Sequence, residues 1–263
     1  MDQRYRQMLP AGICELLDAT EAEMGHEIEV DENYVFGPEA RYEGKVFIPV
    51  ACIVDVMPDC SIKAILPVNG NPSVDQLSHE MLHFHRYVVQ DIPKVLAPFI
   101  HPDDPEARRL SDQFLENELE HLVMVPYLAK RYGLFEGMEV YRKNLRRTWT
   151  NARTRRAWIT ENAATDSNTV MHTLLAWLHT RITLADHGNT ELSGMATEVL
   201  SWAGLLTTAQ WLEKEIRAAH AHENPSEGKV MIAKALGEVI KPPGGWWGYY
   251  IKRRRFELVP LTW

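Results

Sequence analysis

The chain has 263 residues, of which 45% are hydrophobic and 24% charged, and its formal net charge is −8. This composition is typical of a globular protein and excludes a wholly disordered or collagen-like chain. No apolar run approaches the roughly 20 residues of a membrane-spanning helix, and the first ten residues lack the apolar core of a secretory signal. The three cysteines, Cys14, Cys52 and Cys60, form no CxxC pair. We therefore expect no disulfide scaffold, no cysteine-rich zinc site, no membrane association and a cytoplasmic location.

The first part of the chain predicts helix followed by a small sheet. Residues 1–30 contain apolar positions at helical spacing among many acidic residues. Residues 46–48, 53–54 and 62–68 are rich in β-branched and aromatic side chains, and turn signals follow at Pro58-Asp59 and Asn69-Gly70. We expect a small antiparallel sheet of about three strands.

The rest of the chain predicts mainly helices. Ser73 is a candidate cap for a helix from Val74 to about Gln90, and a second helix should cover residues 105–125 and end at Pro126. Further helices are expected over residues 167–186, 191–222 and 227–240, the last capped by Ser226, and the tail 246–263 should add a strand. The predicted fold class is therefore α+β, mostly helical.

The charge is unevenly distributed along the chain. Residues 1–140 hold 11 basic and 25 acidic residues, net −14, whereas residues 141–263 hold 17 and 11, net +6. The densest basic stretch, Arg142–Arg156, contains no acid. Such a stretch forms either a solvated helix face that pairs with acidic residues elsewhere, or a surface that binds nucleic acid or an acidic partner.

The candidate catalytic and metal-binding motif is His79-Glu80-Met81-Leu82-His83, an HExxH sequence. On a helix, residues four apart lie on the same face, so both imidazoles can reach one Zn²⁺ at about 2.0–2.1 Å. Glu80 then lies where it can take a proton from a water molecule that the metal has acidified. The alternative is two surface histidines on an amphipathic helix.

A zinc site needs a third protein ligand, and the candidates lie between residues 115 and 121. On a helical projection Glu118 falls inside the apolar arc, Glu116 at its edge, and Glu120 faces away. A buried carboxylate needs a partner, which for Glu118 is either Zn²⁺ or a salt bridge to a core arginine or histidine. His121, one turn from Glu118, could orient a ligand, stabilise an oxyanion or be the third ligand itself.

A strand, an HExxH helix and a second helix that supplies a glutamate resemble the core of gluzincin-type zinc metallopeptidases. The compact layout of residues 34–128 is similar to minimal intracellular zincins of the ImmA/IrrE kind. The resemblance implies that His79, His83 and Glu118 bind Zn²⁺ and that Glu80 is the general base. We therefore expect a zincin-like core over residues 1–137. The helical pattern and the basic charge of residues 138–263 predict a separate C-terminal helical domain that could bind a partner or substrate.

The leading hypothesis is therefore an intracellular zinc metallopeptidase that hydrolyses a peptide bond in a specific protein substrate. Glu80 would act as general base, and His121 or Tyr127 would support the oxyanion. One alternative is a non-catalytic regulatory or interaction protein, in which HExxH is accidental or holds a structural metal with His85 or His121 as fourth ligand. Another is a metal-dependent hydrolase of a non-peptide substrate.

Overall fold

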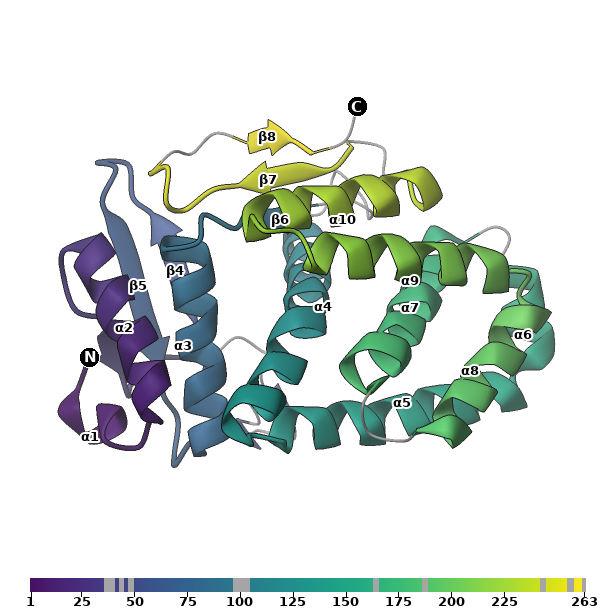
Figure 1. The fold of residues 1–263 in the computed structure, drawn as a ribbon, viewed down its shortest axis with the longest axis horizontal. Coiled ribbons are helices and arrows are strands. Elements are labelled where there is room, and N and C mark those ends of the chain that lie inside the picture. Colours follow the sequence, from purple (N-terminus) through teal and green to yellow (C-terminus); the bar gives the residue numbers. More distant parts are fainter. Residues whose placement is uncertain are drawn as a thin grey trace.

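A computed structural model describes residues 1–35, 41–42, 45–46, 50–96, 105–162, 166–185, 189–241, 245–254 and 258–261. The fold is α+β and mostly helical, as predicted. The helices are α1 (Gln3–Arg6), α2 (Ala11–Met24), α3 (Val74–Val88), α4 (Pro105–Tyr132), α5 (Glu136–Thr154), α6 (Arg156–Asn162), α7 (Ser167–Leu178), α8 (Thr190–Trp202), α9 (Leu206–His220) and α10 (Pro225–Val239). Figure 1 shows the N-terminal sheet, α1 and α2 at one end of the molecule, α3 and α4 in the middle, and helices α5 to α9 toward the other end.

The N-terminal sheet has the strand order β1 (Glu29–Asp31), β5 (Ile62–Pro67), β4 (Ile53–Val56). Strand β4 is antiparallel to β5 as predicted, but β1 pairs with β5 in parallel. Strand β1 begins within residues 1–30, which were predicted to be helical. Helix α2 ends earlier, at Met24, because Gly25 caps it in the left-handed conformation with a φ of 79°. Strands β2 (Arg41–Tyr42) and β3 (Lys45–Val46) form a separate pair. Residues 47–48 of the predicted strand lie outside the described residues.

Helix α3, which carries the HExxH motif, begins where the sequence predicts. Ser73 Oγ accepts a hydrogen bond from the Gln76 N–H, and the Gln76 side chain accepts one from the Ser73 N–H, which completes a capping box. The helix packs against α2 on one side and α4 on the other. Its buried residues therefore surround the helix rather than forming a single stripe, and they include His83, His85 and Arg86.

Helix α4 continues through Pro126, so the prediction that it ends there is wrong. Proline removes one backbone hydrogen bond and disfavours a helix interior. Here the surrounding turns are buried on two sides: Val125 and Ala129 belong to the core formed mainly by the C-terminal helices, and Met124 and Leu128 to the N-terminal core. Tertiary packing on both faces outweighs the local penalty.

The C-terminal helices divide more finely than the sequence predicts. The expected helix 167–186 is α7 followed by a π-helical turn, η2 (His179–Thr183). The expected helix 191–222 is two helices, α8 and α9, separated at Gly204 with a φ of 70°. Helix α10 is capped by Asn224, whose side chain accepts from two backbone N–H groups, while Ser226 instead donates to the Asp91 carbonyl.

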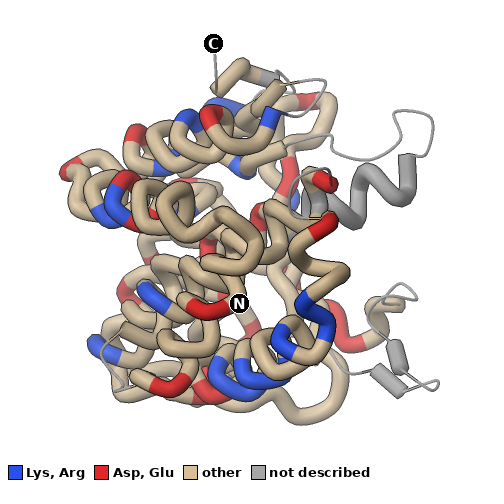
Figure 2. Tube along the Cα trace, turned by 90° about the vertical axis from the view of Figure 1, so that its right-hand side faces the viewer, with Lys and Arg blue, Asp and Glu red and all other residues tan. Residues whose placement is uncertain are grey.

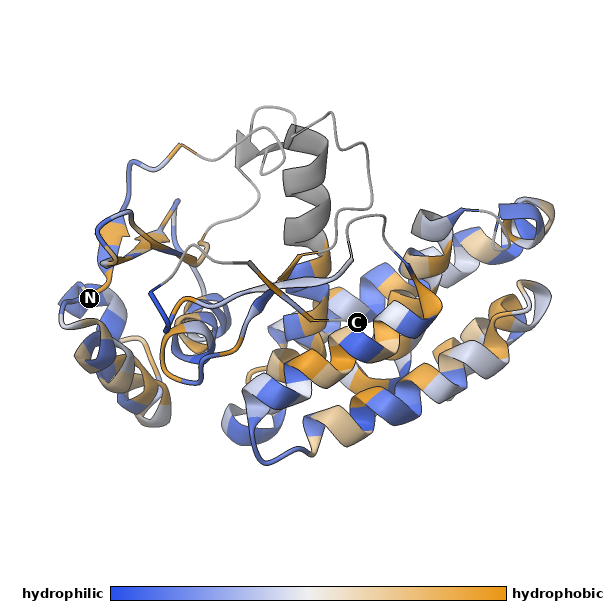
Figure 3. Cartoon of the chain, turned by 90° about the horizontal axis from the view of Figure 1, so that it is seen from above, coloured by the Kyte–Doolittle hydropathy of each residue, from blue (hydrophilic) through white to orange (hydrophobic). Residues whose placement is uncertain are grey.

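The tail forms two strands, where one was expected. Strands β7 (Trp247–Tyr249) and β8 (Leu258–Pro260) join β6 (Lys94–Leu96) in an antiparallel sheet of order β6-β7-β8. Seen from above, hydrophobic and hydrophilic bands alternate along the C-terminal helices, as they do in amphipathic helices (Figure 3). Among the described helices, none combines the length and apolar character needed to cross a membrane.

Candidate metal site

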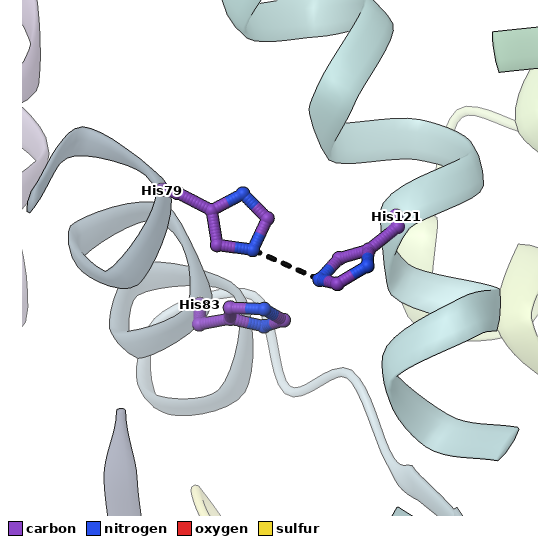
Figure 4. A group of neighbouring side chains, drawn as sticks. All are labelled: His79, His83 and His121. Carbon is purple, nitrogen blue, oxygen red and sulfur yellow. Dashed lines mark hydrogen bonds between the residues drawn. The ribbon is translucent and has the colours of Figure 1, made fainter. Parts of the chain in front are cut away.

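Three imidazoles from two helices converge at the centre of the molecule. His79 and His83 project from successive turns of α3 toward His121 of α4 (Figure 4). One ring nitrogen of each lies within 4.8 Å of those of the other two, and the Nε2 atoms of His79 and His121 are 2.9 Å apart. Among the described residues, this is the group of histidine, cysteine and carboxylate side chains that could hold a metal ion.

The three rings are electrically neutral near pH 7. Burial lowers the pKa of His79 to about 4, and it lowers the pKa of His83 and of His121 well below the usual range. A metal ion binds the neutral form of imidazole, so these rings do not have to release a proton before they bind one. His83 Nδ1 is buried and has no hydrogen-bond partner among the described residues. A buried nitrogen without a partner and a set of three imidazoles both fit a transition-metal ion such as Zn²⁺.

Glu80 lies beside the histidines in a cavity of about 200 Å³. His79, Glu80 and His121 line the cavity together with apolar side chains from the loop before β4 and from α4, α5 and the turn between them, which are Val50, Val125, Leu128, Leu134 and Val140. Burial raises the pKa of Glu80 to about 8, opposed by a hydrogen bond from the Cys52 N–H. A divalent cation nearby would lower that pKa and favour the carboxylate.

Glu118 is not a member of the three-histidine group. Its Oε1 accepts a hydrogen bond of 3.2 Å from Tyr141 Oη, and its Oε2 lies 2.8 Å from His179 Nε2. His179 Nε2 makes no hydrogen bond within the described residues, so the second contact is a close approach of the two side chains. The structure thus places a histidine beside Glu118, which is one of the two kinds of partner expected from the sequence. It brings His121, rather than Glu118, into the group of side chains that could hold a metal ion.

Glu116 and Glu120 point away from the cavity into a buried ionic cluster. Glu120, expected to face away from the apolar arc into solvent, is 0% exposed because both sides of α4 are covered. It binds Arg86 of α3 and Lys229 of α10, with Lys229 Nζ 2.6 Å from Oε1 and Arg86 Nε 2.5 Å from Oε2. Lys229 also lies 3.1 Å from Glu116, which accepts from Tyr87 Oη and the Val95 N–H.

The remaining candidates lie elsewhere. His85 Nδ1 faces the Leu16 carbonyl of α2 at 3.3 Å and is not part of the histidine group. Tyr127 is 41% exposed, and its ring packs on Tyr132 rather than lining the cavity.

The sequence did not point to Tyr141, His179 or Lys229, which contact candidate site residues of α4 from α5, η2 and α10, or to the pairing of Arg86 of α3 with Glu120. Arg86 alone carried a signal, since a charged residue adjoining the apolar stripe of an otherwise buried helix needs a partner.

The basic stretch Arg142–Arg156 forms α5 and the start of α6. Three of its arginines pair with acidic side chains: Arg142 with Glu139, Arg146 with Glu191, and Arg153 with Glu198. Arg155 and Arg156 stack over Trp158 and Trp202. Figure 2 shows basic and acidic segments close to one another on this side of the molecule. These contacts favour the solvated, internally paired face over a nucleic-acid surface.

The site therefore combines three neutral imidazoles with a cavity that Glu80, two further carboxyl groups (Asp75 and Glu136) and several apolar side chains line. The two helices that carry the histidines are joined by a buried ionic cluster. Comparison with protein-family models, curated proteins and solved structures finds no match for this chain.

Proposed function

We propose that this protein is a zinc metallopeptidase whose metal is held by His79, His83 and His121, with Glu80 as general base. The observation that carries the proposal is the convergence of three imidazoles, two of which, those of His79 and His121, line one cavity together with Glu80. Three protein ligands leave a position for water, as catalytic rather than structural zinc sites do. The order of strand, HExxH helix and second helix also supports a zincin-like peptidase, with histidine in place of the gluzincin glutamate.

The chain's own groups can perform the proton transfers of peptide hydrolysis. Bound Zn²⁺ would supply Lewis acidity to a carbonyl group and to a water molecule. The Glu80 carboxylate, which lines the cavity next to His79, would accept a proton from the attacking water and would donate it to the leaving amine. His121 Nδ1 faces Tyr141 Oη, and its Nε2 faces His79 within the histidine group, so its place in this proposal is that of a ligand and not of an oxyanion donor.

The cavity lining supports an apolar group in the substrate next to the scissile bond. Val50, Leu128 and Val140 line it within reach of Glu80, and a volume of about 200 Å³ accommodates one large side chain. The natural substrate is a protein or peptide, and a cytoplasmic location remains a prediction from the three free cysteines.

The test uses the full chain loaded with Zn²⁺, the Glu80→Gln variant loaded in the same way, and the chelated wild type. Each is incubated with a cell extract of heat-denatured proteins, and new amino termini are identified by mass spectrometry. We expect new termini from the loaded wild type alone, although Glu80→Gln binds the same amount of zinc. Equal termini in wild type and Glu80→Gln would refute the role of Glu80. Unfolding on chelation would instead indicate a structural metal.

A further inference from the structure

We infer that Tyr141 and Glu118 are positioning residues for His121, holding its ring in the tautomer that leaves Nε2 free for the metal. The contacts form a line: His121 Nδ1 lies 2.8 Å from Tyr141 Oη, which lies 3.2 Å from Glu118 Oε1. The inference rests on the proposed function only in requiring a metal among the three histidines.

The direction of the hydrogen bonds follows from counting protons. Tyr141 has one hydroxyl hydrogen, and the Glu118 carboxylate offers only acceptors, so the tyrosine donates to the carboxylate. His121 Nδ1 must then carry a hydrogen and donate to Tyr141 Oη. A neutral imidazole with its hydrogen on Nδ1 has its lone pair on Nε2, which is the atom facing His79.

The tyrosine and the carboxylate are themselves held by the C-terminal helices. The Tyr141 ring stacks on His179, with centroids 4.2 Å apart and planes 18° apart, and His179 Nε2 lies 2.8 Å from Glu118 Oε2. His179 Nδ1 in turn lies 2.9 Å from Thr183 Oγ1. These two residues begin and end the π-helical turn η2, a rare conformation that is frequent at functional sites.

These contacts therefore connect His121 of α4, the inferred metal ligand, to Tyr141 of α5 and His179 of η2. Hydrogen-bond partners of this outer kind fix the tautomer and raise the basicity of a ligating histidine. Removing one typically costs about 10–100-fold in metal affinity. Residues after position 138 thus contribute to the metal site as well as to the core.

The experiment measures Zn²⁺ affinity of the full chain by competition with a chromophoric chelator. Tyr141→Phe removes the hydroxyl and keeps the ring that stacks on His179. Glu118→Gln keeps an acceptor for Tyr141 and removes the charge. Tyr249→Phe is the matched control, because Tyr249 Oη donates to Asp55 Oδ1 at 2.7 Å in another tyrosine–carboxylate pair, between β7 and β4.

We expect Tyr141→Phe to weaken Zn²⁺ binding by about 10–100-fold, Glu118→Gln to weaken it less, and Tyr249→Phe to leave it unchanged. Nitrogen NMR of the metal-free wild type should show His121 with its hydrogen on Nδ1, a preference that Tyr141→Phe should lose. The NMR measurement distinguishes a change in the His121 tautomer from a general loss of stability. If Tyr141→Phe does not fold, the Zn²⁺ affinity of Glu118→Gln tests the inference in its place.

Tight wild-type binding with an unchanged affinity in Tyr141→Phe and Glu118→Gln would overturn the inference and leave the proposed metal site intact. A His121 hydrogen on Nε2 in the metal-free wild type would overturn it as well. No Zn²⁺ binding by the wild type would instead refute the proposed function, and the inference with it.

Discussion

Replacing Lys229 by methionine tests whether α10 braces the two helices of the candidate site. Lys229 Nζ lies 2.6 Å from Glu120 and 3.1 Å from Glu116, and all three side chains are buried. Burial raises the pKa of Glu120, but Arg86 and Lys229 outweigh it and hold the pKa well below its usual range. Without Lys229, two buried carboxylates would face a single guanidinium.

The expected loss is large because the remaining charges have no route to solvent. Breaking a buried ion pair by removing one partner typically costs about 3–5 kcal/mol, and the close contact to Glu120 places Lys229→Met in that range. Adding Glu116→Gln should recover part of the loss, since the remaining Arg86–Glu120 pair is balanced. The amide oxygen of the new side chain can still accept from the Val95 N–H in place of Oε2, and its NH₂ group can donate to the Tyr87 hydroxyl in place of Oε1. The coupling energy between the two substitutions should be about 2 kcal/mol, near the upper part of the range for contacting residues.

Urea unfolding of the metal-free proteins, followed by circular dichroism, gives the four free energies of this double-mutant cycle. A matched control is Lys234→Met, on the exposed side of the same helix. A loss below about 1 kcal/mol in Lys229→Met, or additive losses in the double variant, would refute the reasoning that these charges form one buried unit.

Two further predictions concern metal and pH. Zn²⁺ at 100 times its dissociation constant should raise the free energy of unfolding by about 2.7 kcal/mol, measured by thermal or urea unfolding, and His121→Ala should abolish the gain. Burial lowers the pKa of His220 from 6.5 to about 4, so between these values the unfolded chain binds more protons than the native one. Stability should therefore fall by about 3 kcal/mol as pH drops through that window, and unfolding of His220→Gln should show a correspondingly smaller fall. An unchanged pH dependence in His220→Gln would contradict this assignment.

Local signals in the sequence predicted the elements that local chemistry controls. The capping residues at Ser73 and Gln76 and the following apolar spacing place α3 correctly, and with it His79, Glu80 and His83 on successive turns. The apolar run at residues 62–68, followed by the turn signal at Asn69-Gly70, likewise predicts β5. Each of these depends on contacts between residues close in the chain.

What the sequence could not predict depends on packing between distant segments. A helical projection assumes one buried face, but α4 lies between two cores, which is why it continues past Pro126 and why Glu120 is buried. The same arrangement separates Glu118 from the three histidines of the proposed metal site, since its partners come from α5 and η2. The π-helical turn itself has no recognised sequence signal here.

The central claim, that three histidines form the metal site, is tested most directly by zinc content and affinity of wild type, His121→Ala and Glu118→Ala. The account predicts about one zinc ion per chain in the wild type, none in His121→Ala, and one per chain at saturating zinc but with weaker affinity in Glu118→Ala. Retention of zinc by His121→Ala together with its loss from Glu118→Ala would contradict the account and return the third ligand to Glu118.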